Sequence, residues 1–281
     1  MTTDFQAQVN NHYGRANLSD AILQGLRSAV KDPQRPSYDD LAPLDQFHSR
    51  GKLATIELAQ SANLQLGIQV LDLGGGLGGP ARTLAAEFGC RVTVLDLTQE
   101  YCRIGAMLTE RTGLSELVTF RHGDALDLPF ADASYDVVWT QHSSMNVENK
   151  ERLYQEARRV LRPAGRLAIY EIMAGLLQPA HFPVPWAADP SISFLRPVAA
   201  MRSLIERTGF TELSFQDKSK IALAWFYERN ASKPSTLPPL GLHLLVGDRF
   251  KLAFENVIRN LEEDRIAVIE AVYQVNDESS V

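Results

Sequence analysis

The sequence predicts an α/β fold built on a mostly parallel sheet of seven strands. Between Gln69 and Met173, short apolar runs alternate with helical patterns, giving five strand–helix alternations. Apolar runs without polar alternation are typical of strands covered on both faces, as in parallel sheets. Two further strand patterns, at 210–217 and 266–275, complete the seven. A domain with this order of elements packs helices on both faces of one sheet.

Composition sets the outer bounds on function. The chain has 281 residues, 45% of them hydrophobic, and a net charge of −6. The negative charge argues against a general polyanion-binding role, so no nucleic acid partner is expected. Two cysteines are too few for a disulfide scaffold. Neither a signal-peptide pattern nor a long apolar run is seen, so we expect no membrane partner and a cytoplasmic protein.

The first 65 residues read as a helical cap that precedes the sheet. Ser19 is a plausible N-cap for a helix over 20–31, because its hydroxyl can accept from a free backbone N–H. A second helical region over 41–65 contains the polar stretch DQFHSRGK. That stretch is either a solvated turn between two helices or a segment that covers the binding site. In the second case, Arg50 or its neighbours are expected to face an anionic group of the ligand. Tyr13 also has two interpretations. It is either an exposed residue without a functional role, or the N-terminal segment folds over the site and contributes Tyr13 to it.

Residues 66–281 are predicted to form the main domain, and the stretch from 69 to 97 is its most informative part. It predicts a strand at 70–73, a glycine turn at 74–79, a helix at 80–88 and a strand ending at Asp96. Glycines at 74, 76 and 78 let a ligand approach the backbone and leave helix-end N–H groups available. An acid that closes the second strand, some twenty residues on, is placed to accept both hydroxyls of a ribose.

The remaining elements alternate regularly. The predicted helices cover 99–111, 151–161, 198–208, 221–230 and 244–262, and the predicted strands cover 118–122, 135–139, 167–173, 210–217 and 266–275. Residues 174–197 break the pattern with five prolines. A long irregular segment in a compact domain is more often a lid or binding loop than filler, so 174–197, together with 230–245, is predicted to cover the site.

The glycine turn carries a more specific pattern than a generic nucleotide loop. A dinucleotide site has G-x-G-x-x-G, whereas this chain has Asp72-x-Gly74-x-Gly76-x-Gly78. This form resembles motif I of the class I S-adenosylmethionine methyltransferases. The acid can face the cationic aminoacyl end of that cofactor, directly or through water. An oxidoreductase that binds NAD is the alternative from another class, and the glycine spacing counts against it.

Two further passages resemble the same family. Gly123-Asp124-Ala125 follows the third strand. At this position the family has a carboxylate that accepts a hydrogen bond from the adenine amino group, and the backbone of the next residue contacts the adenine ring. The passage RVLRPAGRL resembles the family's helix–turn–strand passage before the fifth strand. Residues 40–275 as a whole are similar to the small-molecule branch, including sarcosine/dimethylglycine N-methyltransferase-like and UbiE-like enzymes. The resemblance implies a Rossmann-like sheet whose last strand is antiparallel.

The implied function is transfer of a methyl group from S-adenosylmethionine to nitrogen or oxygen of a small metabolite, leaving S-adenosylhomocysteine. N-methylation of an amine or N-heterocycle is slightly favoured over O-methylation of a phenol or hydroxyl and over C-methylation. A non-catalytic S-adenosylmethionine-binding protein is a further alternative. The acceptor molecule is not predictable from the sequence, and a homodimer is one option for the assembly. The residues after the fourth strand, TQHSSMN, lack the tetrad of DNA amino-methyltransferases.

Site residues follow from position in the predicted sheet, because ligands lie at the carboxyl ends of parallel strands. His142 follows the fourth strand and is predicted to act as the base or to orient the substrate, with a backbone-bonded histidine as the alternative. The predicted catalytic residues are His142 and Tyr13; the cofactor residues are Arg50, Asp72, Gly74, Gly76, Gly78, Asp96, Leu97, Asp124, Ala125 and Gln141; the substrate residues are Asn146, Trp186, Phe182 and His181. No metal is expected.

Overall fold

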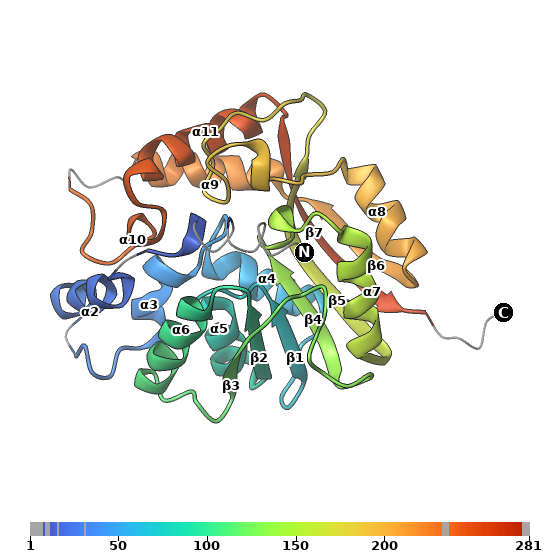
Figure 1. Cartoon of the computed structure of the whole chain (residues 1–281), viewed down its shortest axis with the longest axis horizontal. Coiled ribbons are helices and arrows are strands. Elements are labelled where there is room, and N and C mark those ends of the chain that lie inside the picture. The colour runs from blue at the N-terminus through green and yellow to red at the C-terminus, as the bar shows by residue number, and fades with distance from the viewer. Residues whose placement is uncertain (1–7, 9–11, 16, 31, 232–235, 277–281) are drawn as a thin grey trace.

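The computed structural model describes residues 8, 12–15, 17–30, 32–231 and 236–276. The strands form one seven-stranded sheet in the order β3-β2-β1-β4-β5-β7-β6 (Figure 1). Their bounds are β1 Gln69–Leu73, β2 Arg91–Asp96, β3 Val118–His122, β4 Tyr135–Gln141, β5 Leu161–Ala174, β6 Phe210–Asp217 and β7 Ile266–Val275. The predicted seven-stranded α/β sheet is therefore confirmed.

The direction of the strands follows the predicted pattern. β1 to β5 pair in parallel, and β7 runs antiparallel between β5 and β6. The largest difference lies in β5, which begins at Leu161 instead of residue 167. Its first residues include the RPAG turn passage, where Ala164 takes a φ of 59° and the register against β4 shifts. A turn embedded in a pairing strand produces such an irregularity.

Helices cover both faces of the sheet. Their bounds are α2 Leu18–Ala29, α3 Tyr38–Asp45, α4 Lys52–Ser61, α5 Gly79–Phe88, α6 Gln99–Arg111, α7 Lys150–Val160, α8 Val198–Arg207, α9 Ser219–Ala231, α10 His243–Val246 and α11 Phe250–Glu262. One core cluster joins α4, α5, α9 and α11 to the sheet through residues such as Leu58, Leu84 and Val257. The opposite cluster joins α7 and α8 to it through Tyr154 and Leu204. Alternate residues of each strand enter the two clusters, as the pleat requires.

The N-terminal helices differ from the sequence prediction at one cap and agree with one of its two alternatives at the polar stretch. α2 is capped by Asn17, with a φ of 62°, so the prediction of Ser19 as its N-cap is wrong. The region over 41–65 is divided into α3 and α4 by residues 46–51, as expected if the polar stretch is a turn between two helices. Arg50 and Gly51 both have positive φ there, a conformation that a continuing helix excludes. Ser37 caps α3 through a reciprocal bond with Asp40, a capping box.

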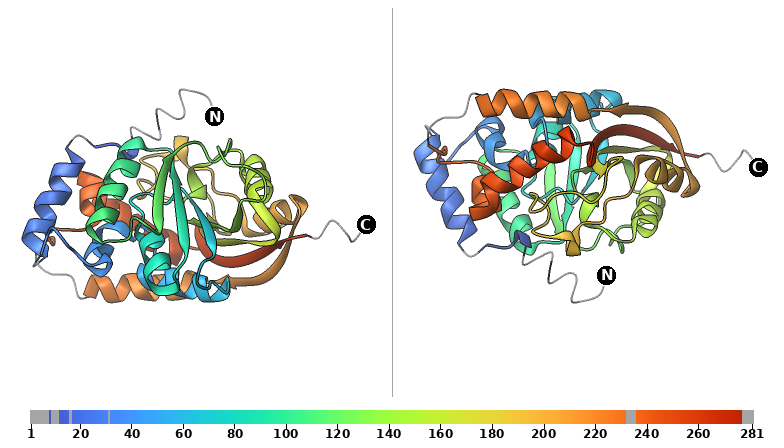
Figure 2. Two further views of the ribbon diagram at one scale, coloured as in Figure 1. Left: turned by 90° about the horizontal axis from the view of Figure 1, so that it is seen from below. Right: turned by 90° about the horizontal axis from the view of Figure 1, so that it is seen from above.

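The helix predicted over 244–262 is also divided. α10 ends at Gly247, whose φ is 70°, and a short 3₁₀ turn over Gly247–Arg249 precedes α11. Glycine adopts this backbone conformation without steric cost, so the chain turns here instead of continuing. Both views in Figure 2 place α2 at one end of the molecule and the β6–β7 edge at the other.

The segment 174–197 is irregular, as predicted, apart from a 3₁₀ turn over Pro190–Ile192. Side chains of α11 hold it. Asn260 accepts from the backbone N–H of His181 and donates to the His181 carbonyl, and Asn256 donates to the carbonyl of Pro183. In the part of the chain that the structure describes, no helix is long and apolar enough to cross a bilayer.

Candidate active site

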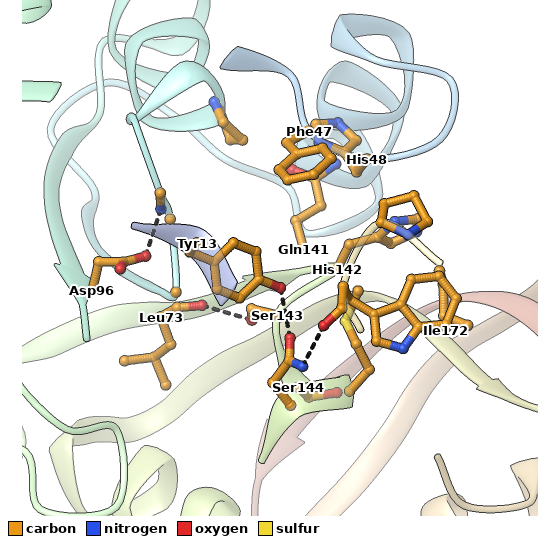
Figure 3. A pocket seen from close by; sticks show the side chains of 18 of the residues that line it. Tyr13, Phe47, His48, Leu73, Asp96, Gln141, His142, Ser143, Ser144 and Ile172 are labelled. Atoms are coloured by element: carbon orange, nitrogen blue, oxygen red, sulfur yellow. Dashed lines mark hydrogen bonds between the residues drawn. The ribbon is translucent and has the colours of Figure 1, made fainter. Parts of the chain in front are cut away.

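The main pocket lies at the carboxyl ends of β1, β2 and β4 (Figure 3). It is lined by residues 72–77 at the end of β1 and beyond, 95–98 at the end of β2 and beyond, 123–125 after β3, and 141–147 at the end of β4 and beyond. Side chains from the N-terminal segment, from α9 to α11 and from Trp186 complete the walls. This edge of an open parallel sheet is where ligands bind, because strand ends and helix N-termini converge there.

The loop after β1 reaches the pocket through backbone alone. Gly74 and Gly76 line the pocket with φ values of 72° and 58°. A Cβ on Gly74 would lie 2.5 Å from the Cβ of Ser143, so only glycine fits there. Gly78 does not line the pocket; it is the N-cap of α5 and packs against Phe120. The sequence prediction that Gly78 meets the cofactor is therefore not supported by its position.

Asp96 ends β2 with its carboxylate held at the pocket. One oxygen accepts from the backbone N–H of Gly76 at 2.9 Å (Figure 3), and the other accepts from the backbone N–H of Thr98 at 2.8 Å. Leu97 beside it also lines the pocket. Burial raises the pKa of Asp96, while the two backbone N–H groups lower it. Each oxygen keeps a lone pair, so the carboxylate is oriented to accept from two adjacent hydroxyls.

Asp72 is the most perturbed carboxyl group of the pocket. It is 1% exposed, and its Oδ2 is buried without a hydrogen-bond partner. Burial, reinforced by the charge of Asp96, raises the pKa of Asp72 to about 8. An orphaned acceptor of this kind is costly unless something satisfies it. A cationic group in the pocket would satisfy it and would stabilise the ionised form.

Two unpartnered donors also face the same cavity. The indole N–H of Trp139 can only donate, and it donates to Oε1 of Gln141. Thr55 donates to the same oxygen, which fixes the orientation of the amide and leaves its Nε2 buried without a partner. The hydroxyl of Tyr101 is buried and unpartnered as well. Gln141 and Tyr101 both line the pocket, and these two atoms have no hydrogen-bond partner within the protein.

The turn after β3 forms another part of the lining. Gly123, Asp124 and Ala125 all contribute to it. Oδ1 of Asp124 accepts from the backbone N–H of Leu126 at 2.9 Å, which fixes the carboxylate relative to the turn. A fixed acceptor beside a backbone N–H matches the hydrogen-bonding edge of an adenine ring.

His142 lies directly after β4 and lines the pocket. Its φ is 49°, an uncommon conformation for a residue with a side chain. The ring stacks on Tyr170 with centroids 5.3 Å apart, and Nε2 lies 3.4 Å from Oγ of Ser49. Burial, followed by the nearby His48, lowers the pKa of His142 well below its usual value. The imidazole is therefore neutral at pH 7 and carries a lone pair.

His48 is a second pocket histidine, which sequence reasoning did not single out by itself. Its Nε2 donates to the carbonyl of Gly51 at 3.0 Å, which leaves Nδ1 unprotonated in the neutral ring. Burial lowers the pKa of His48 to about 4. The rings of His48 and His142 have centroids 6.1 Å apart. The pocket thus holds two neutral imidazoles, and the FHSRG stretch faces it through Phe47, His48 and Ser49.

Tyr13 and Asn146 form a clamp across the pocket. The Tyr13 hydroxyl donates to Oδ1 of Asn146 at 2.7 Å (Figure 3). The Asn146 amide donates to the carbonyls of Trp186 at 2.9 Å and Ile192 at 2.8 Å. One side chain at the end of β4 therefore ties the N-terminal segment to the segment 174–197. Tyr13, Asn146 and Trp186 all line the pocket, as the sequence predicted for residues of a covered site.

Besides Gly78, three predicted site residues lie outside the pocket lining. The guanidinium of Arg50 makes two hydrogen bonds to Glu57, and Arg50 is not part of the lining, so the expectation that it meets the cofactor carboxylate is wrong for this structure. His181 binds Glu263 and the side chain of Asn260. Phe182 packs against the core beside α11 and does not reach the pocket. The sequence around Arg50 does not indicate which carboxylate its guanidinium pairs with.

Three aromatic residues of the C-terminal helices also line the pocket and were not predicted from the sequence: Trp225 and Phe226 of α9 and Phe254 of α11. Leu242 and Leu245 beside them belong to the segment 230–245 that was expected to cover the site. The apolar spacing of the aromatic residues along a helix is the same for an ordinary core face, so no local signal distinguishes the two. Among the described residues, no cluster of three or more His, Cys, Asp or Glu side chains is arranged to hold a metal ion.

The chain is similar to known methyltransferases in sequence. Residues 71–169 match the family model described as a methyltransferase domain. A sarcosine/dimethylglycine N-methyltransferase from Halorhodospira halochloris is 31% identical over 187 residues, covering 64% of this chain and 63% of that protein. The chain spans between 30% and 63% of the length of the curated relatives that it matches first.

Solved structures share the fold over nearly the whole chain. A geranyl diphosphate C-methyltransferase from Streptomyces coelicolor A3(2) has a TM-score of 0.70 at 18% identity, covering 98% of this chain and 100% of that one. The [4+2]-cyclase SpnF has a TM-score of 0.66 at 21% identity, covering 96% of this chain and 97% of that one. At these identities the likeness concerns the fold. The sheet order, the glycine loop and the lining acids agree with the matched domain, and this chain is similar to S-adenosylmethionine-dependent methyltransferases over residues 71–169.

Proposed function

We propose that this protein transfers a methyl group from S-adenosylmethionine to a nitrogen or oxygen atom of a small molecule, with nitrogen favoured. One observation carries the proposal. The orphaned carboxyl of Asp72, the oriented carboxylate of Asp96 and the Asp124 turn line one pocket, and the neutral His142 lines it as well. This set offers acceptors for an aminoacyl ammonium, a ribose and an adenine ring. S-adenosylmethionine, when bound, supplies a methyl group already activated on its sulfonium.

The chain's own residues fit that cofactor. Asp96 would accept the two ribose hydroxyls, and Asp72 would accept from the ammonium of the aminoacyl end. Asp124 and the backbone of Ala125 would hold the adenine edge. The orphaned Nε2 of Gln141 is a donor for the carboxylate, the role that the sequence first suggested for Arg50. Gly74 and Gly76 allow the close backbone approach that such a ligand needs.

The pocket favours an acceptor that already has a free lone pair. A phenol or an alkylammonium must lose a proton before it can attack, and an efficient general base has a pKa near the working pH. His48 and His142 both have lowered pKa values, so they are weak bases. A neutral amine or a ring nitrogen needs no strong base. His142 would then orient the acceptor by accepting a hydrogen bond and would receive a proton only after the transfer.

The remaining residues would exclude water from the reacting groups. The clamp of Tyr13, Asn146 and Trp186 joins the N-terminal segment to the segment 174–197 beside the pocket. In a dry pocket, methyl transfer competes well against attack by water, and the acceptor is held in line. Residues 1–65, 174–197 and 230–245 are accordingly proposed as the cap and lid of the catalytic domain. A small-molecule partner, a cytoplasmic location and a homodimer stay predictions.

Two alternatives rest on the relatives and the fold. The solved geranyl diphosphate enzyme is named a C-methyltransferase and the cyclase is not named a methyltransferase, so carbon as acceptor and a non-methylating role stay open as competing proposals. The N-methyltransferase relative supports nitrogen. An NAD-binding oxidoreductase has no support among these relatives.

The test uses S-adenosylmethionine with a trideuterated methyl group and a mixed panel of amines, N-heterocycles, phenols and enolisable carbon acids. Mass spectrometry locates the label, and the assay is repeated with His142→Ala and His142→Asn. The asparagine variant is the matched control because asparagine tolerates the positive φ. Label on a nitrogen, with less than about a tenfold rate loss in both variants, supports positioning. Label on a phenol with a loss of about 10²-fold or more would assign general base catalysis to His142.

A further inference from the structure

The C-terminal helices give the pocket an apolar wall, formed by Trp225, Phe226, Leu242, Leu245, Phe254 and Val257. The aromatic members contact one another: the ring centroids of Trp225 and Phe226 are 4.9 Å apart, and those of Phe226 and Phe254 are 6.3 Å apart. Ile172 of β5 and Val268 of β7 also line the pocket. None of the cofactor contacts proposed above involves this wall. It is therefore available to the methyl acceptor.

The charges of the pocket are one-sided. Among the described residues that line it are four carboxyl groups, Asp45, Asp72, Asp96 and Asp124, and neither lysine nor arginine. The two lining histidines, His48 and His142, have pKa values lowered by burial. Three of the acids have proposed cofactor roles, and Asp45 is paired with Arg82. An anionic acceptor would find no counter-charge in this lining.

Cations close to the pocket are committed to other partners. Arg82 binds Asp45 at 2.5 Å, Arg50 binds Glu57, and Nζ of Lys150 donates to the carbonyls of Ser144 and Val147. Arg15 donates to the carbonyl of Leu244. Moving any of these groups into the pocket would break bonds that are buried or half-buried. In the proposed function, one anionic group enters the pocket, which is the carboxylate of the cofactor. The side-chain amide of Gln141 is the proposed hydrogen-bond donor to it.

From the apolar wall and the absence of cations in the described lining, we infer that the acceptor site takes a predominantly apolar molecule that carries no anionic group. This inference rests on the proposed function and adds the substrate class to it. Burying an ion without a partner is far more costly than burying an apolar group, which gains from leaving water. Amino acid acceptors such as those in the relative's name carry a carboxylate. Diphosphates need cations or a bound metal, and the described residues provide no metal cluster.

The test compares two fluorescent compounds with one ring system, N-phenyl-1-naphthylamine and its sulfonated analogue 8-anilinonaphthalene-1-sulfonate. Each is titrated into the full chain with and without saturating S-adenosylhomocysteine. The neutral amine is expected to bind at a single site with a Kd at least about tenfold lower than the sulfonate. Binding of S-adenosylhomocysteine is measured separately by calorimetry. Failure of that binding would count against the proposed function, whereas the preference between the two dyes tests the acceptor site.

Variants locate the preference at the wall. Phe254→Lys places a cation inside it and is expected to remove the preference for the neutral dye, a change of about tenfold or more. Leu252→Lys is the matched control, because Leu252 lies on the same helix but is 51% exposed and outside the lining. Trp225→Arg on α9 repeats the test if Phe254→Lys does not fold. The inference is overturned if the sulfonate binds the wild type within about threefold of the amine, or if both wall variants leave the preference unchanged.

Discussion

Binding of the cofactor is predicted to release a proton from Asp72. The pKa of this buried group is raised to about 8 in the folded protein. At pH 7 its carboxyl is therefore protonated in about nine molecules of ten. The proposed ammonium partner favours the ionised form, because an opposite charge at short range lowers the pKa of a carboxyl. Binding of S-adenosylhomocysteine, which keeps that ammonium, should thus release up to one proton per molecule bound at pH 7.

The sign of the pH dependence follows. Below pH 8 the free protein must lose the proton in order to bind, so the affinity rises by up to about tenfold per pH unit and levels off above pH 8. Calorimetry in two buffers of different ionisation enthalpy measures the number of protons released. Asp72→Asn should weaken binding and abolish both the release and the slope. Asp124→Asn, at the proposed adenine end, should weaken binding but keep the slope. Wild-type binding without proton release between pH 6 and 7 would refute the assignment of Asp72.

Three further predictions concern the glycine loop, His142 and the buried ion pair. Gly76→Ala should destabilise the fold by about 1–2 kcal/mol through its positive φ alone, whereas Gly74→Ala should cost about 2–5 kcal/mol because its Cβ also meets Ser143; urea unfolding compares them, and equal losses would contradict the close approach. Since the pKa of His142 is lowered, its charged form appears only well below pH 6.5, so kcat/KM for the acceptor, measured with S-adenosylmethionine saturating at every pH, should show no histidine-linked decrease between pH 8 and 6.5; a decrease centred near 6.5 would contradict the buried, neutral ring. Arg82→Met should destabilise by about 3–5 kcal/mol because it leaves Asp45 buried and unpaired, and Asp45→Leu in the same chain should recover part of that loss in the same urea assay; no recovery would argue against the pair.

The sequence predicted the sheet well because its signals are local. The apolar runs at 118–122, 210–217 and 266–275 appear as β3, β6 and β7 with the same bounds. The helix at 99–111 is also unchanged, with Gly113 in the left-handed region just beyond it. Strand period, glycine turns and helix ends depend on neighbouring residues, which a single sequence displays.

Errors arose where tertiary contacts decide the outcome. Arg50 was placed near the cofactor, but its guanidinium pairs with Glu57 seven positions later, beyond the helix break. Gly247 divides the helix predicted over 244–262, because its positive φ is set by packing that the sequence does not display. The protonation states of the site histidines were likewise not predictable from the sequence. The neutral state of His48 follows from burial between segments that are distant in the sequence.

The central claim is that the pocket at the ends of β1, β2 and β4 is a site for S-adenosylmethionine, and equilibrium titration tests it without knowledge of the acceptor. The full chain is titrated by calorimetry with S-adenosylmethionine and, separately, with NAD. We predict saturable binding of S-adenosylmethionine at one site per chain, displaced by S-adenosylhomocysteine and weakened by Asp96→Asn, with no saturable binding of NAD. Saturable NAD binding that Asp96→Asn weakens, or no binding of S-adenosylmethionine, would contradict the account.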